Sequence, residues 1–348
     1  MTHARGYAVH DAHSHLVPFQ FERREPGPHD VRIEILYCGI CHSDLHQAHD
    51  DWSNSMYPMV PGHEIVGRVT AVGAHVSKLK VGELAGVGCM VDSCRHCAAC
   101  NADLEQYCEK GATWTYNDRE RDTGAPTFGG YSDHIVVDEH FVVKVPANLD
   151  LKAVAPLLCA GITTYSPLRY VNVQPGQKVG VIGLGGLGHM GVKFAKAMGA
   201  HVVMITTSPE KGKDATRLGA DEILVSRDPA AMARHAGSFD FLLNTIPVGH
   251  DVNPYLALLK LDGKMDMVGV LTDIEPLNGA NLIFGRKTLF GSGIGGMAET
   301  QEMLDFCGAH HIVSDVEVIA MQDVNDAYVR MQKNDVRYRF VIDMASLK

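Results

Sequence analysis

The sequence has no apolar run approaching the roughly 18 residues of a membrane-spanning helix, so a transmembrane protein is not expected. Basic residues are also outnumbered: 31 lysines and arginines against 41 aspartates and glutamates give a formal net charge of −10. That charge repels a phosphate backbone or an anionic lipid surface, so nucleic acids and membranes are not expected partners. Residues 1–11 lack the apolar stretch and cleavage site of a secretory signal, and we expect a cytoplasmic protein.

What the sequence does contain is thiol groups. Nine cysteines are an odd number in a long chain without a signal sequence, which argues against a disulfide framework. Clustered thiols in such a protein are more often metal ligands or catalytic groups. The 348 residues suggest about two domains.

The two halves of the chain differ in pattern. The first half is β-rich, with strand-like runs at 31–37, 65–72 and 134–145. From about residue 176, apolar strands alternate with helical segments, which predicts a parallel sheet with helices on both faces, inserted into the first domain. The predicted strands here are 178–183, 201–206, 222–226, 239–246, 264–270 and 288–294, and the predicted helices are 189–199, 209–218, 228–235, 253–260 and 298–311.

A glycine-rich hexamer follows the first of these strands and opens a helix. Gly183 permits a tight turn, Gly185 lets the backbone approach a pyrophosphate, and Gly188 allows close packing of helix and strand. Backbone N–H groups at the helix start then face the phosphates. A glycine-rich turn without a ligand is the alternative. The candidate cofactor residues are Gly183, Gly185, Gly186, Leu187 and Gly188.

An acidic residue is missing where an NAD-selective site places one to bind the ribose 2′-hydroxyl. No Asp or Glu occurs between Gly183 and Pro209. Hydroxyl groups and an ammonium group stand there instead, and they suit a 2′-phosphate, which a carboxylate repels. We therefore predict a preference for NADP(H), the alternative being that the lysine is only a solvated helix residue. The candidate residues are Thr206, Thr207, Ser208 and Lys211.

Four cysteines, Cys94, Cys97, Cys100 and Cys108, are close enough in sequence to enclose one tetrahedral Zn²⁺ with no open position. An iron–sulfur cluster is the runner-up, but its fourth cysteine typically follows after three residues rather than seven. A DNA-reading zinc finger is disfavoured because the surrounding segment is acidic. We predict a structural zinc site.

A second, dispersed set consists of Cys41, His63 and Cys159. Two thiolates and one imidazole leave one tetrahedral position open for a substrate, the arrangement known from alcohol dehydrogenase. Taken singly, Cys159 or His63 would more often be a packed core residue, and the sequence does not show that the three residues meet.

The chain resembles the zinc-dependent medium-chain alcohol dehydrogenases, most closely their cinnamyl-alcohol-dehydrogenase-like branch of NADP(H)-dependent aldehyde reductases. The resemblance runs almost end to end. The matching segments are G-I-C-H-S-D-L-H (39–46), Y-P-M-V-P-G-H-E-I-V-G (57–67), the four-cysteine segment, W-T-Y-N-D (114–118), G-G-Y-S (129–132), P-L-L-C-A-G-I-T-T-Y-S-P-L (156–168), G-L-G-G-L-G-H-M-G (183–191) and N-D-V-R-Y-R-F-V (334–341).

This resemblance implies an α/β architecture with two domains. A β-rich, GroES-like catalytic domain is expected at 1–158 and 297–348, and a Rossmann domain with a doubly wound parallel sheet at 159–296. Relatives are commonly homodimers that join through an edge strand, for which 288–294 is the candidate.

The resemblance also implies roles for single residues. Cys41, His63 and Cys159 would bind a catalytic zinc, with Glu64 as an alternating or neighbouring ligand and Asp44 orienting the histidine. The remaining implied roles are proton transfer for Ser43, His46 and Asp51, a nicotinamide contact for Thr163, and substrate-pocket walls for Trp114 and Tyr116, although Trp114 could be only a packing aromatic.

The implied activity is hydride transfer between NADP(H) and an alcohol/aldehyde pair, as a broad-specificity aldehyde reductase with two zinc ions per subunit. Gly293 departs from plant relatives, which carry a bulky aromatic near the pocket, so large cinnamyl substrates are in doubt. A zinc-free quinone or enone reductase on the same scaffold is the alternative, and a non-enzymatic zinc-storage or regulatory protein is a third.

Overall fold

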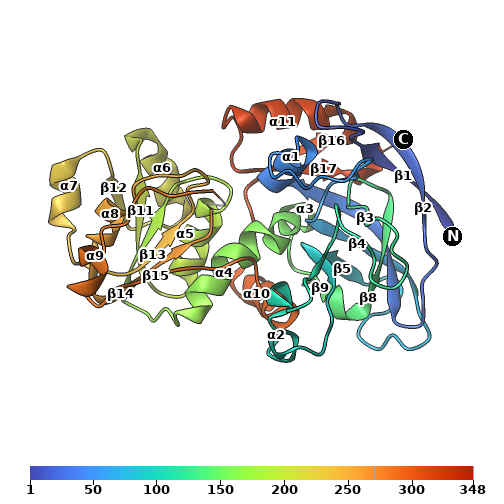
Figure 1. The fold of residues 1–348 in the computed structure, drawn as a ribbon, viewed down its shortest axis with the longest axis horizontal. Coiled ribbons are helices and arrows are strands. Elements are labelled where there is room, and N and C mark those ends of the chain that lie inside the picture. Colours follow the sequence, from blue (N-terminus) through green and yellow to red (C-terminus); the bar gives the residue numbers. More distant parts are fainter. Residues whose placement is uncertain (270–271, 348) are drawn as a thin grey trace. The chain divides into compact units, whose positions relative to one another are not determined.

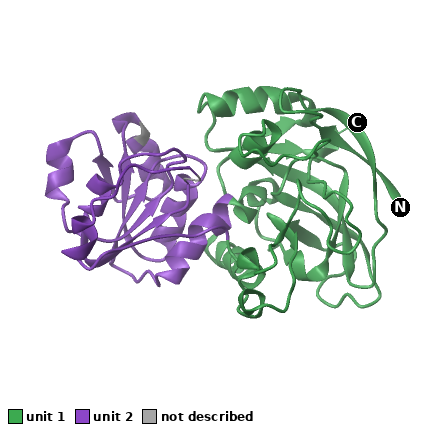
Figure 2. Ribbon diagram, viewed as in Figure 1, with its two compact units in different colours: residues 1–159, 295–348 green, residues 160–294 purple. Residues whose placement is uncertain are grey.

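The computed structural model describes residues 1–269 and 272–347, with the side chain of Lys211 outside that description. The chain forms two compact units (Figure 2). Unit 1 comprises residues 1–159 and 295–348, and unit 2 comprises residues 160–294. These limits differ by one residue and by two residues from the predicted domain limits at 158/159 and 296/297.

Unit 1 is built on a seven-stranded sheet in which the long strand β3 (Asp30–Ile40) is central (Figure 1). The branched apolar residues of β3 alternate with polar ones, as a strand with one buried face requires. The other strands are β16 (Val316–Ala320), β17 (Arg339–Asp343), β4 (Ile65–Val72), β5 (Leu84–Val87), β8 (His134–Asp138) and β9 (Val143–Lys144).

Shorter elements complete unit 1. Strands β1 (Thr2–Ala8) and β2 (Val17–Arg23) form an antiparallel pair, and β6 (Met90–Asp92) pairs with β7 (Thr113–Trp114). The helices are α1 (His42–Ala48), α2 (Ala98–Asn101), α3 (Leu151–Val154), α10 (Met297–His310) and α11 (Val324–Gln332).

Unit 2 contains a six-stranded parallel sheet. Its strand order is β12 (Glu222–Val225), β11 (His201–Thr206), β10 (Lys178–Ile182), β13 (Phe239–Asn244), β14 (Leu259–Met267) and β15 (Thr288–Gly291). The helices are α4 (Ala160–Tyr170), α5 (Gly188–Ala197), α6 (Pro209–Leu218), α7 (Pro229–Arg234), α8 (Asn253–Leu256) and α9 (Ala280–Ile283).

The order of the strands in this sheet reverses beside β10, between its neighbours β11 and β13. That reversal is the switch point at which doubly wound folds bind their ligands, beyond the carboxyl ends of the strands. The predicted parallel, doubly wound sheet is therefore confirmed.

Three sequence predictions of elements need correction. The run 134–145 is not one strand, because a 3₁₀ turn at Glu139–Phe141 separates β8 from β9. The helix predicted at 253–260 ends at Leu256, and β14 begins at Leu259. The strand predicted at 264–270 begins earlier, at Leu259, and ends at Met267, and its predicted last residue, Val270, lies outside the described residues. No helix in the described parts of the chain has the length and apolar character to cross a membrane.

Candidate functional site

Within the described residues, two groups of side chains could each hold a metal ion. One group is Cys41, His63, Glu64 and Cys159, and the other is the four-cysteine set. In each group the possible donor atoms all lie within 4.8 Å of one another. Residues separated by 118 positions in the sequence therefore meet, which the sequence pattern alone left open.

The start of α1 positions the first ligand candidate, because Cys41 is the N-cap residue of this helix. Its backbone N–H donates to Oδ2 of Asp44 at 2.8 Å, and Oδ1 of the same carboxylate lies 3.1 Å from Nδ1 of His63. Oδ1 also accepts from the Gly62 N–H at 3.1 Å. The fully buried Asp44 thus fixes the orientation of the imidazole and leaves the other ring nitrogen, Nε2, for a metal.

Cys159 follows a buried 3₁₀ turn at Ala155–Leu158, and its Sγ lies 3.9 Å from Sγ of Cys41. The hydrogen bond with Cys159 is the main reason why the pKa of the Cys41 thiol is lowered, and it raises the pKa of Cys159 in turn. A bound cation would favour the thiolate form of both cysteines. Two thiols and one imidazole are the donor types that zinc prefers.

Glu64 is fully buried and pairs with Arg339 on β17. Burial raises the pKa of Glu64 to about 7, while Arg339 opposes that rise. The second carboxylate oxygen, Oε2, has no hydrogen-bond partner, as expected for an atom available to a metal. Arg339 was not predicted as a site residue; an arginine inside the apolar strand segment 339–342 was the signal that could have found it.

The predicted proton-transfer residues lie on and just after α1. Oγ of Ser43 is 3.7 Å from Sγ of Cys41, and Nδ1 of His46 lies 2.7 Å from Oδ2 of Asp51. The side chains of His46 and Asp51 are 39% and 46% exposed, so this pair contacts solvent. The arrangement has a hydroxyl beside the metal-ligand candidates and a polar pair open to water.

The two predicted pocket aromatics differ in their surroundings. Tyr116 is buried and stacks on the His63 ring, with centroids 5.8 Å apart and an interplanar angle of 22°. Trp114 is 44% exposed. Tyr116 therefore lies against one of the metal-ligand candidates, whereas the Trp114 side chain is exposed to solvent.

The four-cysteine set surrounds α2. Sγ of Cys100 lies 3.5 Å from Sγ of Cys97 and 3.9 Å from Sγ of Cys94. Backbone N–H groups point at two of the sulfurs: that of Cys94 donates to Cys108 at 3.3 Å, and that of Glu109 donates to Cys97 at 3.4 Å. Such donors stabilise thiolates, and backbone N–H groups lower the pKa of Cys97 to about 6.

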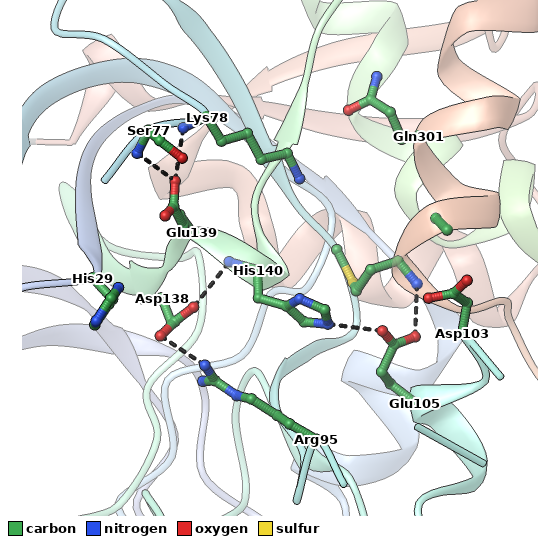
Figure 3. Close-up of a pocket in the computed structure, with 12 residues that line it drawn as sticks. His29, Ser77, Lys78, Arg95, Asp103, Glu105, Asp138, Glu139, His140 and Gln301 are labelled. Atoms are coloured by element: carbon green, nitrogen blue, oxygen red, sulfur yellow. Dashed lines mark hydrogen bonds and ion pairs between the residues drawn. The ribbon is translucent and has the colours of Figure 1, made fainter. Parts of the chain in front are cut away.

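A polar cavity of about 500 Å³ beside this segment contains none of the predicted site residues (Figure 3). Several of its charged groups are paired with one another or with the backbone. Glu105 accepts hydrogen bonds from the Met297 backbone N–H at 3.0 Å and contacts His140 at 2.8 Å, while Arg95 binds Asp138 at 2.8 Å. These contacts attach the four-cysteine segment to the start of α10, so the cavity has a structural explanation.

The glycine loop in unit 2 lies between β10 and α5. Gly183 has φ of +92°, and a Cβ on Gly188 would lie 1.9 Å from the Gly183 carbonyl oxygen, so neither position accepts a side chain without distortion. A Cβ on Gly185 would meet nothing within 4 Å, which leaves the space that a pyrophosphate needs. Gly186 and Leu187 lead directly into α5.

The predicted 2′-phosphate residues follow β11. Thr206 is buried and its Oγ1 accepts from the Ser208 N–H at 3.3 Å, whereas Thr207 is exposed and Ser208 is the N-cap residue of α6. The side chain of Lys211 lies outside the described residues. Thr163 is a buried residue of α4.

Sequence reasoning missed a buried carboxylate at the end of β14. Asp266 is fully buried, and its Oδ2 accepts from the Ser292 hydroxyl at 2.6 Å while Oδ1 has no partner. Burial raises the pKa of Asp266 to about 6. The bond ties β14 to the segment after β15 that contains Gly293, around which a Cβ would find open space.

Comparison with known proteins adds to this geometry. Residues 27–147 match the alcohol dehydrogenase GroES-like domain, and residues 186–336 match the zinc-binding dehydrogenase family. The chain is 54% identical to aldehyde reductase YahK of Escherichia coli (strain K12) over 345 residues, which cover 99% of each chain.

Two solved structures have the same fold. A cinnamyl alcohol dehydrogenase (SbCAD4) of Sorghum bicolor is 50% identical with a TM-score of 0.96, covering 100% of this chain and 99% of that one. A CAD of Helicobacter pylori, solved in complex with NADP(H), is 41% identical with a TM-score of 0.93 and the same coverage. The predicted family and two-domain fold class are confirmed: this chain belongs to the zinc-binding alcohol dehydrogenases, in the group that contains aldehyde reductases and cinnamyl alcohol dehydrogenases.

Proposed function

We propose that this protein reduces a range of aldehydes with NADPH at a zinc site formed by Cys41, His63 and Cys159. The observation that carries this proposal is the convergence of these three side chains, together with Glu64, within 4.8 Å. Two thiols and an imidazole leave the fourth tetrahedral position open for a substrate. This is the arrangement of catalytic zinc sites, whereas structural zinc sites have four protein ligands. The four-cysteine set would hold the second, structural zinc.

A zinc ion at the first group would supply Lewis-acid polarisation of a carbonyl oxygen. Glu64 would serve as an alternating ligand, because one of its oxygens lies within 4.8 Å of the other donor atoms and Oε2 has no hydrogen-bond partner. Asp44 would keep His63 in the tautomer that offers Nε2.

The residues of α1 would handle the proton. Ser43, close to the Cys41 sulfur, is the candidate donor of the proton that the product alcohol gains. His46, hydrogen-bonded to Asp51 and partly exposed, would resupply that proton from water. Removal of His46 would then slow proton delivery without removing a metal ligand.

NADP(H) is the proposed dinucleotide, which supplies the hydride when bound. The glycine loop with Gly186 and Leu187 would bind the pyrophosphate, and Thr163 would contact the nicotinamide. The hydroxyls of Thr206, Thr207 and Ser208 would bind the 2′-phosphate with Lys211, and the missing acidic residue supports this choice. The NADP(H) complex of the Helicobacter pylori relative supports the same choice.

The proposal extends to the substrate range and the assembly of the protein. Gly293 would leave room in the pocket and, with Trp114 and Tyr116 as walls, favour varied aldehydes over one large substrate. We also propose a cytoplasmic homodimer that joins through residues 288–294, which include the edge strand β15. The catalytic domain would be 1–158 with 297–348, and the dinucleotide domain 159–296.

The test combines metal content with turnover. Cys41→Ser should lower the zinc content from two to one per chain and abolish NADPH-dependent reduction of an aldehyde panel, while NADPH binding measured by fluorescence is retained. Cys307→Ala, which changes a buried thiol on α10, serves as the control and should keep both zinc ions. Full activity of Cys41→Ser without metal at that site would overturn the proposal and favour a zinc-free reductase.

A further inference from the structure

Two buried tyrosines are hydrogen-bonded in a chain to Asp44, and the proposed function gives neither of them a role. Tyr131, from the segment G-G-Y-S before β8, is fully buried, and Tyr328 on α11 is 6% exposed. The Tyr131 hydroxyl donates to Oδ2 of Asp44 at 3.3 Å, and the Tyr328 hydroxyl donates to the Tyr131 oxygen at 3.4 Å. The three residues form one hydrogen-bonded chain that ends at the carboxylate beside His63.

Asp44 depends on its hydrogen-bond donors because its carboxylate is fully buried. Oδ1 receives the Gly62 N–H and faces His63, whereas Oδ2 receives the Cys41 N–H and the Tyr131 hydroxyl. A buried anion without enough donors is strongly destabilised. The Tyr131 hydroxyl is therefore a side-chain donor to Oδ2, in addition to the backbone donor from Cys41.

The second hydroxyl strengthens the first. A hydroxyl that accepts a hydrogen bond becomes a better donor, so Tyr328 polarises Tyr131 toward Asp44. Its effect on Asp44 must pass through the Tyr131 oxygen, because no direct bond from Tyr328 to Asp44 is observed in the described part of the chain.

The ring of Tyr131 has a separate, structural role. A Cβ on Gly62 would lie 2.7 Å from Cδ1 of Tyr131, so the ring packs on the backbone just before His63. Replacement by phenylalanine keeps this packing and removes only the hydroxyl, which allows the two roles to be measured separately.

We propose that Tyr131 and Tyr328 are positioning residues that hold His63 as a metal ligand, because their hydrogen-bonded chain fixes the Asp44 side chain that contacts the imidazole. This inference rests on the proposed function, which assigns His63 to a zinc ion. Loss of the Tyr131 hydroxyl should weaken the hold of the site on its metal while the four-cysteine site is unaffected.

The experiment follows zinc transfer from the full-length, zinc-loaded protein to a chromogenic chelator. The Cys41→Ser variant identifies the kinetic phase of the first site, because that phase should be missing from it. Tyr131→Phe should accelerate this phase about tenfold, the lower end of the effect usual for groups that support a metal ligand. Tyr328→Phe should accelerate it by a smaller factor.

The double variant gives the sharpest outcome. Because Tyr328 acts through the Tyr131 hydroxyl, Tyr131→Phe with Tyr328→Phe should match Tyr131→Phe alone. Tyr57→Phe is the matched control: it removes a hydroxyl that donates to the Ala48 carbonyl at 2.9 Å, and it should leave the rate unchanged.

The results distinguish a failure of this inference from a failure of the proposed function. An unchanged rate in Tyr131→Phe, or equal acceleration of both zinc phases, would overturn the inference and leave the proposed function standing. A wild-type protein with no Cys41-dependent phase would overturn the proposed function, and the inference with it.

Discussion

Arg339 and Glu64 form an ion pair with side chains only 5% and 0% exposed, directly beside His63. Each partner has one further nitrogen or oxygen atom without a hydrogen bond, Nε in Arg339 and Oε2 in Glu64. Water cannot reach either side chain to solvate its charge, so each charged group is stabilised mainly by the other.

Replacement of Arg339 by methionine should destabilise the protein by about 3–5 kcal/mol, because it leaves the Glu64 carboxylate buried without its partner. Urea denaturation of the variant and the wild type at pH 7.5 measures the difference in the free energy of unfolding. Combination with Glu64→Gln, which removes the other charge, should recover most of the loss. Equal stabilities of the single and double variants would show that the pair does not matter.

A carboxylate placed at the end of β11 should reverse the nucleotide preference. Thr207 is exposed there, and Thr207→Glu should lower kcat/KM for NADPH by about 10–100-fold because the new charge repels the 2′-phosphate. Steady-state rates with NADPH and NADH at fixed aldehyde concentration measure the change. The uncharged Thr207→Gln is the control, and a similar loss in that variant would mean that shape rather than charge is responsible.

Removal of the metal ion from the four-cysteine site should lower the free energy of unfolding. Cys100→Ser, made in the Cys41→Ser protein so that one zinc remains at the start, should destabilise it by about 4 kcal/mol or more. Thermal unfolding with and without chelator measures this, since chelator should lower the melting temperature of the parent and not that of the variant. A chelator-insensitive parent would contradict the structural zinc.

The buried carboxyl of Asp266 predicts a pH dependence of a definite sign. Its pKa is raised by burial to about 6, so the folded state binds this proton more tightly than the unfolded state does. The resulting stabilisation is complete at low pH and is lost as the pH rises through 6.

Asp266→Asn removes this titration. Relative to the wild type, the variant should gain about 1–2 kcal/mol of stability between pH 5 and pH 7.5, as measured by urea denaturation at each pH. Ser292→Ala is the companion variant, because it keeps the carboxyl group and should keep the pH dependence. A constant difference between Asp266→Asn and the wild type would contradict the raised pKa.

Helices and strands in which apolar and polar residues alternate with a clear period were predictable from the sequence. The strand at Ile65–Val72 and the helix at Pro209–Leu218 have the predicted limits. Elements without a period were not. Helix α4 is buried at every position from Ala160 to Leu168 and contains Pro167, so it has no polar face that would reveal a helix. The residues around Leu256 and Leu259 are also apolar and buried, so the sequence has no polar position that marks the end of α8 and the start of β14.

The site was predictable only where residues had a known partner type. The spacing of the four cysteines predicts a metal site, and the structure brings their sulfur atoms together. The approach of Cys159 to Cys41 depends on how η3 (Ala155–Leu158) packs, which no local pattern encodes. Arg339 and Tyr328 reach the site from β17 and α11 near the end of the chain, and spacing alone predicts no such long-range contact.

The candidate metal ligands all lie in unit 1, whereas the glycine loop and the end of β11 lie in unit 2. Substitutions in the proposed dinucleotide residues of unit 2 should therefore alter coenzyme use without changing the metal content of unit 1. Assays of the two properties should vary independently across a library of such variants.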